Sequence, residues 1–270
     1  MHSDAIAADH ELLGAATREA GRLALDYFRR GDVRRWDKKP GDPVSEADIA
    51  VDRLLRKRLV GERADYGWLS EETADNLSRL KHQRVWVVDP IDGTRAFLEG
   101  RPEFTIAAAL VVEGEPVAAV VFNPATEEFY EATSGGGARL NGTPLRVAAR
   151  TDLAGARLLA SKRTFERNEW LHLTPGAEFR YMNSIALRMA KVASGEFHAA
   201  ISLSEKSDWD IAAADLIVRE AGGGCTTCGD GRFVYNRQAL RHPSVLAAAP
   251  GVHGILIGLL GGLDREEQEY

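Results

Sequence analysis

The chain has 270 residues, of which 44% are hydrophobic and 27% are charged. This length suffices for one large domain or two closely packed ones, and the composition is that of a globular protein. The net charge of −6 argues against a general nucleic-acid-binding surface. It does not exclude a small phosphorylated substrate, because bound metal ions can invert the local sign of charge.

The first 150 residues predict two helices and a largely antiparallel sheet. Apolar residues recur at helical spacing from Asp4 to Arg30. A second helix is expected over 45–60, with Ser45 and Asp48 spaced as a capping box, and a charged loop is expected between the helices at 34–43. Strand-like runs follow at 67–70, 84–89, 104–112, 116–123 and 128–132. The segments 113–115 and 135–142 predict a hairpin turn and a glycine-rich turn region.

The remaining residues alternate strands and helices, which is typical of an α/β unit. Strands are predicted at 157–160, 179–182, 197–203 and 244–249, and helices at 163–173, 184–194 and 210–221. We therefore expect an N-terminal α+β subdomain (1–150) and a C-terminal α/β subdomain (151–270). The apolar stretch 254–263 is about half the length needed to span a bilayer. Since residues 1–10 also lack the pattern of a signal peptide, we expect a cytoplasmic protein without a membrane anchor.

One segment combines metal-binding and anion-binding chemistry. The apolar run that ends at Val88 continues into Asp89-Pro90-Ile91-Asp92-Gly93-Thr94. Carboxylates are hard ligands that suit Mg²⁺ or Mn²⁺. Gly93 permits close backbone approach, and Thr94 opens a predicted short helix whose amide groups can receive a phosphate. The segment therefore predicts a divalent-metal site beside a phosphate site.

Further acids stand near the ends of other predicted elements. Glu71 and Glu72 follow a strand, Asp48 lies in the first turn of the second helix, and Asp210 begins a later helix. Each alone is explained as a solvated loop acid or a helix cap. Together with Asp89, which is placed to bridge two ions, they predict a two-metal site.

These motifs resemble the inositol monophosphatase superfamily of Mg²⁺-dependent, lithium-sensitive phosphatases. The segment 89–94 matches one signature of that superfamily in full. Trp209-Asp210-Ile211-Ala212-Ala213, with Glu220-Ala221-Gly222-Gly223 downstream, matches a second. Segments 69–72 and 42–48 match the paired glutamates and an early Asp-x-Val-x-x-x-Asp element. The resemblance extends over almost the whole chain and implies an α/β fold of layered α-β-α-β-α type.

The resemblance also implies a metal-activated water as the nucleophile, with about two to three Mg²⁺ ions per active site and Mn²⁺ as a substitute. The first ion would be held by Glu71, Asp89 and the carbonyl of Ile91. The second would be held by Asp89, Asp92 and Asp210. Thr94, supported by Asp48, would help activate the water, and Glu71 would help hold a third ion. A homodimer is a further implication of the family alone.

The same resemblance predicts which residues contact the substrate: Asp92, Gly93, Thr94, Ser184, Lys206 and Asp210. Ser184 lies in Asn183-Ser184-Ile185-Ala186-Leu187, which is similar to the Gly-Ser-x-Ala-Leu substrate element except that Asn183 replaces glycine. Arg95 after the Gly-Thr pair looks like the bacterial CysQ group, which removes the 3′-phosphate of 3′-phosphoadenosine 5′-phosphate. Leu203 stands where inositol-specific relatives often carry a glutamate. Lys206 is either a contact for a second phosphate or a solvated loop lysine.

The leading interpretation is a Mg²⁺-dependent phosphomonoesterase acting on a 3′(2′),5′-bisphosphate nucleotide. Inositol-1-phosphate phosphatase and then histidinol-phosphate phosphatase are the alternatives, and an RNA- or transcription-associated binding protein is the non-enzymatic one. Cys225 and Cys228 form a Cys-x-x-Cys pair, which we interpret as ordinary loop or strand residues, with redox sensitivity as the alternative. No second pair is available to complete a structural zinc site.

Overall fold

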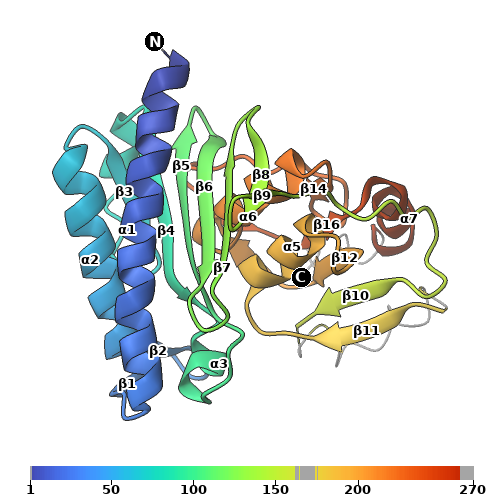
Figure 1. Cartoon of the computed structure of the whole chain (residues 1–270), viewed down its shortest axis with the longest axis horizontal. Helices are drawn as coiled ribbons and strands as arrows, with labels where there is room; N and C mark the ends of the chain where they lie inside the picture. The colour runs from blue at the N-terminus through green and yellow to red at the C-terminus, as the bar shows by residue number, and fades with distance from the viewer. Residues whose placement is uncertain (1, 162–163, 165–173, 175, 262–270) are drawn as a thin grey trace.

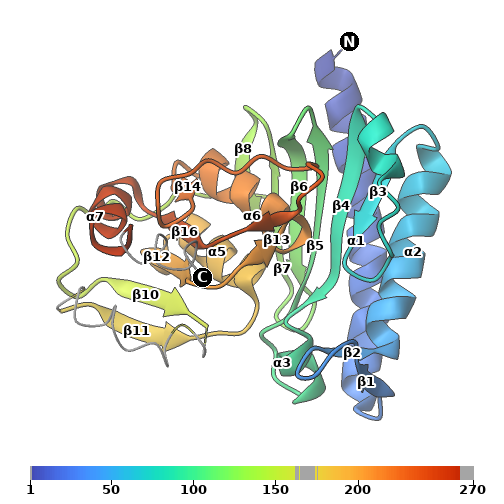
Figure 2. The same ribbon diagram turned by 180° about the vertical axis from the view of Figure 1, so that it is seen from behind.

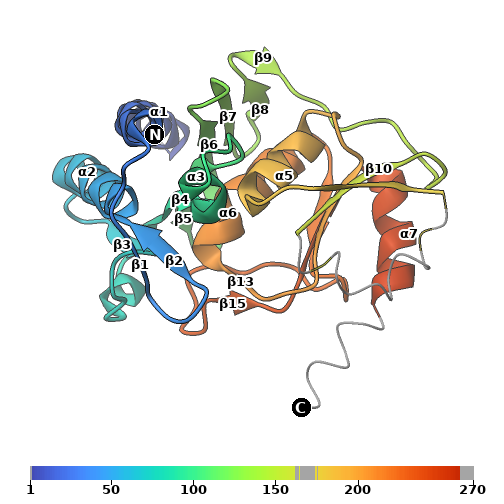
Figure 3. The ribbon, with the colours of Figure 1, turned by 90° about the horizontal axis from the view of Figure 1, so that it is seen from below.

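Two β-sheets alternate with layers of helices along the chain's longest dimension (Figure 1). The computed structural model describes residues 2–161, 164, 174 and 176–261. Seen from below, the order of layers is helix, sheet, helix, sheet and helix (Figure 3). This arrangement confirms the layered α-β-α-β-α fold that the motifs implied.

The first sheet has seven strands in chain order, and β3 and β4 are its only parallel neighbours among the described residues. Its strands are β3 (Gly67–Ser70), β4 (Arg84–Asp92), β5 (Thr105–Val112), β6 (Glu115–Asn123), β7 (Glu128–Thr133), β8 (Gly137–Leu140) and β9 (Thr143–Pro144). Helices α1 (His2–Arg30) and α2 (Glu46–Glu62) cover one face. A 3₁₀ turn, η1 (Ser78–Lys81), connects β3 to β4.

Strand β4 is buried on both faces. Trp86 and Val88 pack into the core beneath α1 and α2, whereas Val85 and Val87 belong to the core on the opposite side. The register between β4 and β5 shifts between Asp89 and Asp92, so that the end of β4 is bulged. A continuous apolar run therefore carries two aspartates out of the centre of the molecule.

The second sheet has five strands in the order β11-β10-β12-β16-β14. Its strands are β10 (Arg157–Ala160), β11 (Glu178–Tyr181), β12 (Ala199–Ser202), β14 (Gly224–Thr226) and β16 (Val245–Ala248). Between the sheets lie α5 (Ile185–Ala193) and α6 (Asp208–Glu220), while α7 (Pro250–Leu260) packs on the far face. A single hydrophobic core contains residues of β4–β8, α5, α6 and the second sheet. The proposed division near residue 150 therefore stays a prediction.

Two short elements complete the described fold near the end of β4. A hairpin of β1 (Arg35–Asp37) and β2 (Pro43–Ser45) lies beside α3 (Thr94–Leu98), as Figure 2 shows. On the other side, β13 (Lys206–Ser207) pairs with β15 (Arg241–His242) immediately before α6. These elements surround the point where β4 leaves the core.

Most predicted elements are confirmed, with three corrections. The prediction of a charged loop at 34–43 is wrong, because β1 and β2 form a hairpin; the side chains of β1 are all exposed and show no apolar alternation. The turn region at 135–142 contains β8. The late helix starts at Asp208 rather than Asp210, since Ser207 is its N-cap. The helix predicted at 163–173 lies outside the described residues, apart from residue 164.

The capping box predicted from Ser45 and Asp48 is present at the start of α2. None of the helices within 2–161 and 176–261 has both the length and the hydrophobicity of a membrane span.

The contact of α1 with the first sheet gives a stability prediction. A Cβ atom at Gly21 would overlap the ring of Phe122, whereas one at Gly14 would lie 3.7 Å from Phe129. Both changes to alanine gain about 1 kcal/mol of helix propensity, but overpacking at Gly21 costs about 1–3 kcal/mol. We expect Gly21→Ala to lower the free energy of unfolding in urea and Gly14→Ala to raise it. Equal effects of the two substitutions would contradict this packing.

Candidate functional site

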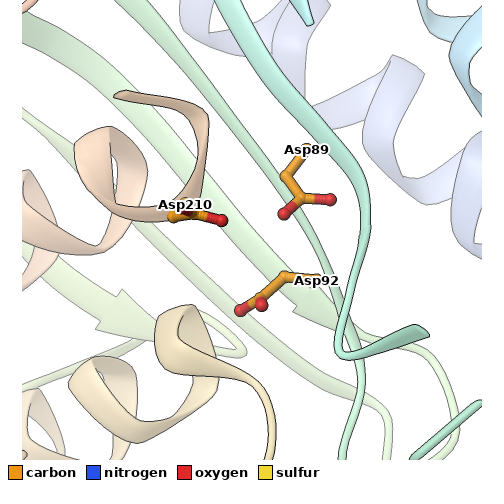
Figure 4. A group of neighbouring side chains, drawn as sticks. All are labelled: Asp89, Asp92 and Asp210. Atoms are coloured by element: carbon orange, nitrogen blue, oxygen red, sulfur yellow. The ribbon is translucent and has the colours of Figure 1, made fainter. Parts of the chain in front are cut away.

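Three aspartates converge where β4 ends and α6 begins. One carboxylate oxygen from each of Asp89, Asp92 and Asp210 lies within 4.8 Å of the other two. Figure 4 shows the three side chains directed toward a common space, although Asp210 comes from a distant part of the sequence. Asp89 and Asp92 are buried, and Asp210 is half-buried. Hard oxygen ligands at this spacing fit a divalent cation such as Mg²⁺ or Mn²⁺.

Asp92 is held by the beginning of α5. Its Oδ2 accepts a hydrogen bond from Ser184 Oγ at 2.5 Å and another from the amide of Ala186 at 2.7 Å. Ser184 Oγ in turn accepts from the amide of Leu187 at 3.0 Å and so caps α5. One oxygen of Asp92 is therefore fixed, and an oxygen of the same carboxylate lies within 4.8 Å of oxygens of Asp89 and Asp210.

The other two aspartates are also held through one oxygen. Asp210 occupies the third position of α6, where its Oδ2 accepts from the amide of Ser207 at 2.6 Å. Asp89 Oδ1 accepts from the amide of Ile91 at 3.1 Å, which closes a turn within the bulge of β4. The carboxylates are thus oriented before any ligand binds, which favours a pre-formed site.

Burial places these acids in an unfavourable environment. Desolvation raises the pKa of Asp210 to about 7, although the charge of Lys206 acts in the opposite direction. Desolvation also raises the pKa of Asp89 well above its ordinary value, with further increases from Glu71, Asp92 and Asp210. A bound cation would relieve both the desolvation and the mutual repulsion. The donor set therefore fits a metal on electrostatic grounds as well as by geometry.

The hydroxyl of Thr94 lies between two elements of the site. Thr94 Oγ1 is 2.9 Å from Asp48 Oδ1 and 3.0 Å from the carbonyl oxygen of Ile91. One hydroxyl proton can serve only one of these acceptors at a time. The second oxygen of Asp48 accepts from the amide and hydroxyl of Ser45 at 2.9 and 2.5 Å. The predicted pair of Thr94 and Asp48 is thus in direct contact.

Gly93 is required by the backbone at this turn. Its φ of 97° is in the left-handed region that favours glycine. A Cβ atom there would lie 2.7 Å from the carbonyl oxygen of Glu103 and 3.3 Å from Ser184 Cβ. The close approach of three segments depends on this position having no side chain.

Glu71 is oriented differently from the three aspartates. Its Oε1 accepts from Lys38 Nζ at 2.7 Å, and Lys38 Nζ also donates to Glu72 Oε1 at 2.9 Å. Glu71 is not part of the aspartate group, but its charge contributes to the raised pKa of Asp89 after desolvation. The structure therefore brings Asp89, Asp92 and Asp210 together and pairs Glu71 with a lysine. Sequence reasoning had assigned no such contact to Lys38.

The predicted substrate contacts differ in their placement. Ser184 is fully buried and donates to Asp92, which supports a positioning role instead of direct contact with a substrate. Lys206 is part-buried, and its Nζ donates to Ser204 Oγ at 3.1 Å and to the carbonyl of Glu205 at 2.9 Å. Since its charge acts on Asp210, Lys206 lies at the edge of the site.

Two supporting residues escaped the sequence analysis. Asp52 of α2 accepts from Ser70 Oγ at 2.5 Å and from Thr73 Oγ1 at 2.9 Å, and so holds the segment that carries Glu71. Arg188 of α5 is buried behind Asp92, and its Nη1 donates to the carbonyl of Ile201 at 2.9 Å. Burial lowers the pKa of Arg188 to about 10, whereas the charge of Asp92 acts to raise it. The available signal was an arginine within the apolar run from Ile185 to Ala190.

The cysteines lie away from this chemistry. Both are buried free thiols, and Cys225 lies in β14. Burial raises the pKa of Cys225 well above its ordinary value, which disfavours the reactive thiolate. The expected strand at Cys225 is therefore present, and the absence of a redox role stays a prediction.

Comparison with known proteins finds relatives that match most of this sequence. The sequence model described as "Inositol monophosphatase family" matches residues 8–260. The inositol-1-monophosphatase of Rhizobium meliloti (strain 1021) is 40% identical over 222 residues, covering 79% of this chain and 83% of that protein. The Nus factor SuhB of Pasteurella multocida is 34% identical, covering 88% and 90%. The histidinol-phosphatase of Chlorobaculum parvum is 33% identical, covering 96% and 98%.

A solved structure is similar over nearly the whole fold. The crystal structure of extragenic suppressor protein suhB from Bartonella henselae superposes with a TM-score of 0.82 at 28% identity, covering 93% of this chain and 97% of that chain. The layered arrangement is therefore shared with a known fold.

The buried carboxylates predict how stability depends on pH when divalent ions are removed. In EDTA, we expect the melting temperature to fall as the pH rises from about 5 to about 8. The reason is that burial raises the pKa of Asp210 to about 7, so the folded chain binds more protons than the unfolded chain in this range. Differential scanning fluorimetry at a series of pH values would measure this effect, and Mg²⁺ should reverse it at the upper end. Asp210→Asn should flatten the profile, and a melting temperature that rises with pH in EDTA would refute the explanation.

Proposed function

We propose a substrate class and a metal requirement for this phosphatase from one premise: the chain belongs to the inositol monophosphatase family. The proposed reaction is hydrolysis of a small phosphate monoester by a water molecule, with two or more divalent cations bound at the end of β4. The observation that carries this proposal is the convergence of Asp89, Asp92 and Asp210, each of which also has one oxygen held by a hydrogen bond.

In this proposal, Asp89, Asp92 and Asp210 hold the cations, joined by Glu71 and the carbonyl of Ile91. Bound Mg²⁺ would supply Lewis acidity toward the phosphoryl oxygens and lower the pKa of a coordinated water. Thr94 and Asp48 form the proton-accepting pair, because the Thr94 hydroxyl lies 2.9 Å from an oxygen of the buried Asp48 carboxylate. The amides of Gly93 and Thr94 at the start of α3 provide donors for phosphate oxygens.

For the substrate, we propose a nucleoside 3′,5′-bisphosphate. Lys206 supports this choice, since it places a positive charge near Asp210 that would pair with a second phosphate. Leu203 is buried in the core beneath α7 and offers no hydrogen bond to a polyol. Two alternatives are favoured by names of relatives: inositol phosphate by the R. meliloti protein and histidinol phosphate by the C. parvum protein.

A role in transcription is the candidate from a different class. The P. multocida relative is named a Nus factor, and a chain can combine such a role with catalysis. The convergence of Asp89, Asp92 and Asp210 supports hydrolysis as the first function of this chain. A homodimer and a cytoplasmic location stay predictions.

Replacement of one ligand gives a direct test of the metal site. Asp92→Asn removes a charged ligand while leaving the side-chain volume nearly unchanged, and we expect phosphate release to fall by about three orders of magnitude or more. Asp152→Asn, at a side chain that is 68% exposed and paired with Arg150, is the matched control and should retain the wild-type rate. EDTA should abolish the wild-type activity, and Li⁺ should inhibit it. Near-normal turnover by Asp92→Asn would exclude the proposed ligand set.

The substrate is tested by comparing 3′-phosphoadenosine 5′-phosphate, inositol 1-phosphate and histidinol phosphate in one phosphate-release assay. We expect the bisphosphate to have the highest kcat/KM. Lys206→Met should raise KM for the bisphosphate by about tenfold, as expected for one lost charge-assisted contact, with little effect on adenosine 3′-phosphate. Lys206→Arg should retain the preference. Faster hydrolysis of either rival would overturn the nucleotidase assignment, and no Mg²⁺-dependent hydrolysis of any of the three would favour the binding role.

A further inference from the structure

The first turn of α6 is bound to a segment of the chain that lies outside the candidate site. Residues 233–242, here called the brace, end in β15, which pairs with β13 directly before α6 (Figure 3). The amide of Asp208 also donates to the carbonyl of Leu240 in the brace at 3.0 Å. Asp210 accepts its hydrogen bond from the amide of Ser207, which belongs to β13. The peptide that holds Asp210 is therefore itself held by the brace.

The carboxylate of Asp208 accepts a hydrogen bond from the brace on each of its oxygens. His242 Nε2 donates to Oδ1 at 2.8 Å, and the amide of Asn236 donates to Oδ2 at 2.7 Å. Asp208 and His242 are both buried, and the imidazole packs against the rings of Phe233 and Tyr235 at centroid distances of 5.0 and 5.5 Å. Because a buried carboxylate that loses a donor is destabilised, the first turn of α6 depends on these two contacts.

The brace also joins α6 to the sheet that carries Asp89 and Asp92. The guanidinium of Arg79 in η1 donates from Nη1 to Asn236 Oδ1 at 2.6 Å and from Nη2 to the carbonyl of Arg237 at 2.9 Å. The Arg79 side chain is fully buried, so solvent and salt screen these contacts little. Since η1 connects β3 to β4, the brace links the start of α6 to the first sheet.

This link matters because the site is divided between two layers of the fold. Asp89 and Asp92 come from β4 and Asp210 comes from α6, yet one oxygen of each lies within 4.8 Å of the others. Mutual repulsion of these buried charges opposes that spacing when no cation is bound. Asp208 and His242 are not members of the aspartate group, and they act on it through the position of α6.

We propose that His242 and Asn236 are positioning residues for the metal site. Through Asp208 they hold the first turn of α6, and with it Asp210, at the distance from β4 that a divalent cation requires. The inference rests on the proposed metal-dependent function. Loss of either contact lets the first turn move away from β4, so that the affinity for metal falls while the reaction at the loaded site is retained.

The test measures binding of Mg²⁺ alone to metal-free protein by isothermal titration calorimetry. His242→Leu removes the donor to Asp208, and we expect Kd for Mg²⁺ to rise by about tenfold, as for other residues that orient metal ligands. In the phosphate-release assay, this variant should need more Mg²⁺ for half-maximal rate but reach the wild-type kcat at saturating Mg²⁺. His242→Gln keeps a side-chain donor and should restore the wild-type Kd.

A second variant tests the link to the first sheet. Asn236→Gly removes the acceptor for Arg79 and keeps the amide that donates to Asp208. The φ of Asn236 is 56°, which glycine adopts without strain. This variant should also raise Kd for Mg²⁺, and it carries the test if His242→Leu does not fold.

Tyr235→Phe is the matched control for a general loss of stability. It keeps the ring beside His242 but removes the buried hydrogen bond from Tyr235 Oη to Asp215 Oδ2 at 2.9 Å, farther along α6. The melting temperature should fall, and Kd for Mg²⁺ should not change. An unchanged Kd in Asn236→Gly and in folded His242→Leu, or an equal rise of Kd in Tyr235→Phe, would overturn the inference. Failure of the wild type to bind Mg²⁺ would instead overturn the proposed function.

Discussion

The main constraint on this structure is the convergence of three aspartates at one largely buried point. Asp89, Asp92 and Asp210 come together at the end of a strand that is apolar on both faces, so water cannot solvate their charges fully. Like charges in such surroundings repel strongly and shift toward the protonated form. The fold tolerates them because each has a hydrogen-bonded oxygen, and because a bound cation would convert the repulsion into attraction.

The start of α6 both caps the helix and supplies a carboxylate to the site. In its capping box, Asp210 at the third position stabilises the first turn through one oxygen, and the same carboxylate belongs to the aspartate group of the site. The start of α2 repeats this design, since Asp48 binds Ser45 through one oxygen and faces Thr94 with the other. Helix capping therefore fixes the orientation of the reactive groups, and local helix stability and site geometry cannot vary independently.

Sequence reasoning succeeded where local chemistry decides the structure. The capping box at Ser45, the glycine at Gly93 and the apolar strand before Asp89 each depend on neighbours in the chain, and all three are present. It failed where partners are distant. Lys38 meets Glu71 across 33 positions and Ser184 meets Asp92 across 92. No periodicity encodes such contacts, because they arise only when separate elements pack together.

The anchoring of Asp92 and Asp210 has a consequence for the size of ion that the site accepts. Their fixed oxygens accept hydrogen bonds from the starts of α5 and α6, so a ligand shift of a few tenths of an ångström would stretch those bonds. Magnesium binds oxygen at about 2.0–2.1 Å, whereas calcium prefers about 2.3–2.6 Å and more ligands. The two helix termini would thus select for an ion of small radius. Discrimination against calcium would originate in backbone amides that do not contact the ion.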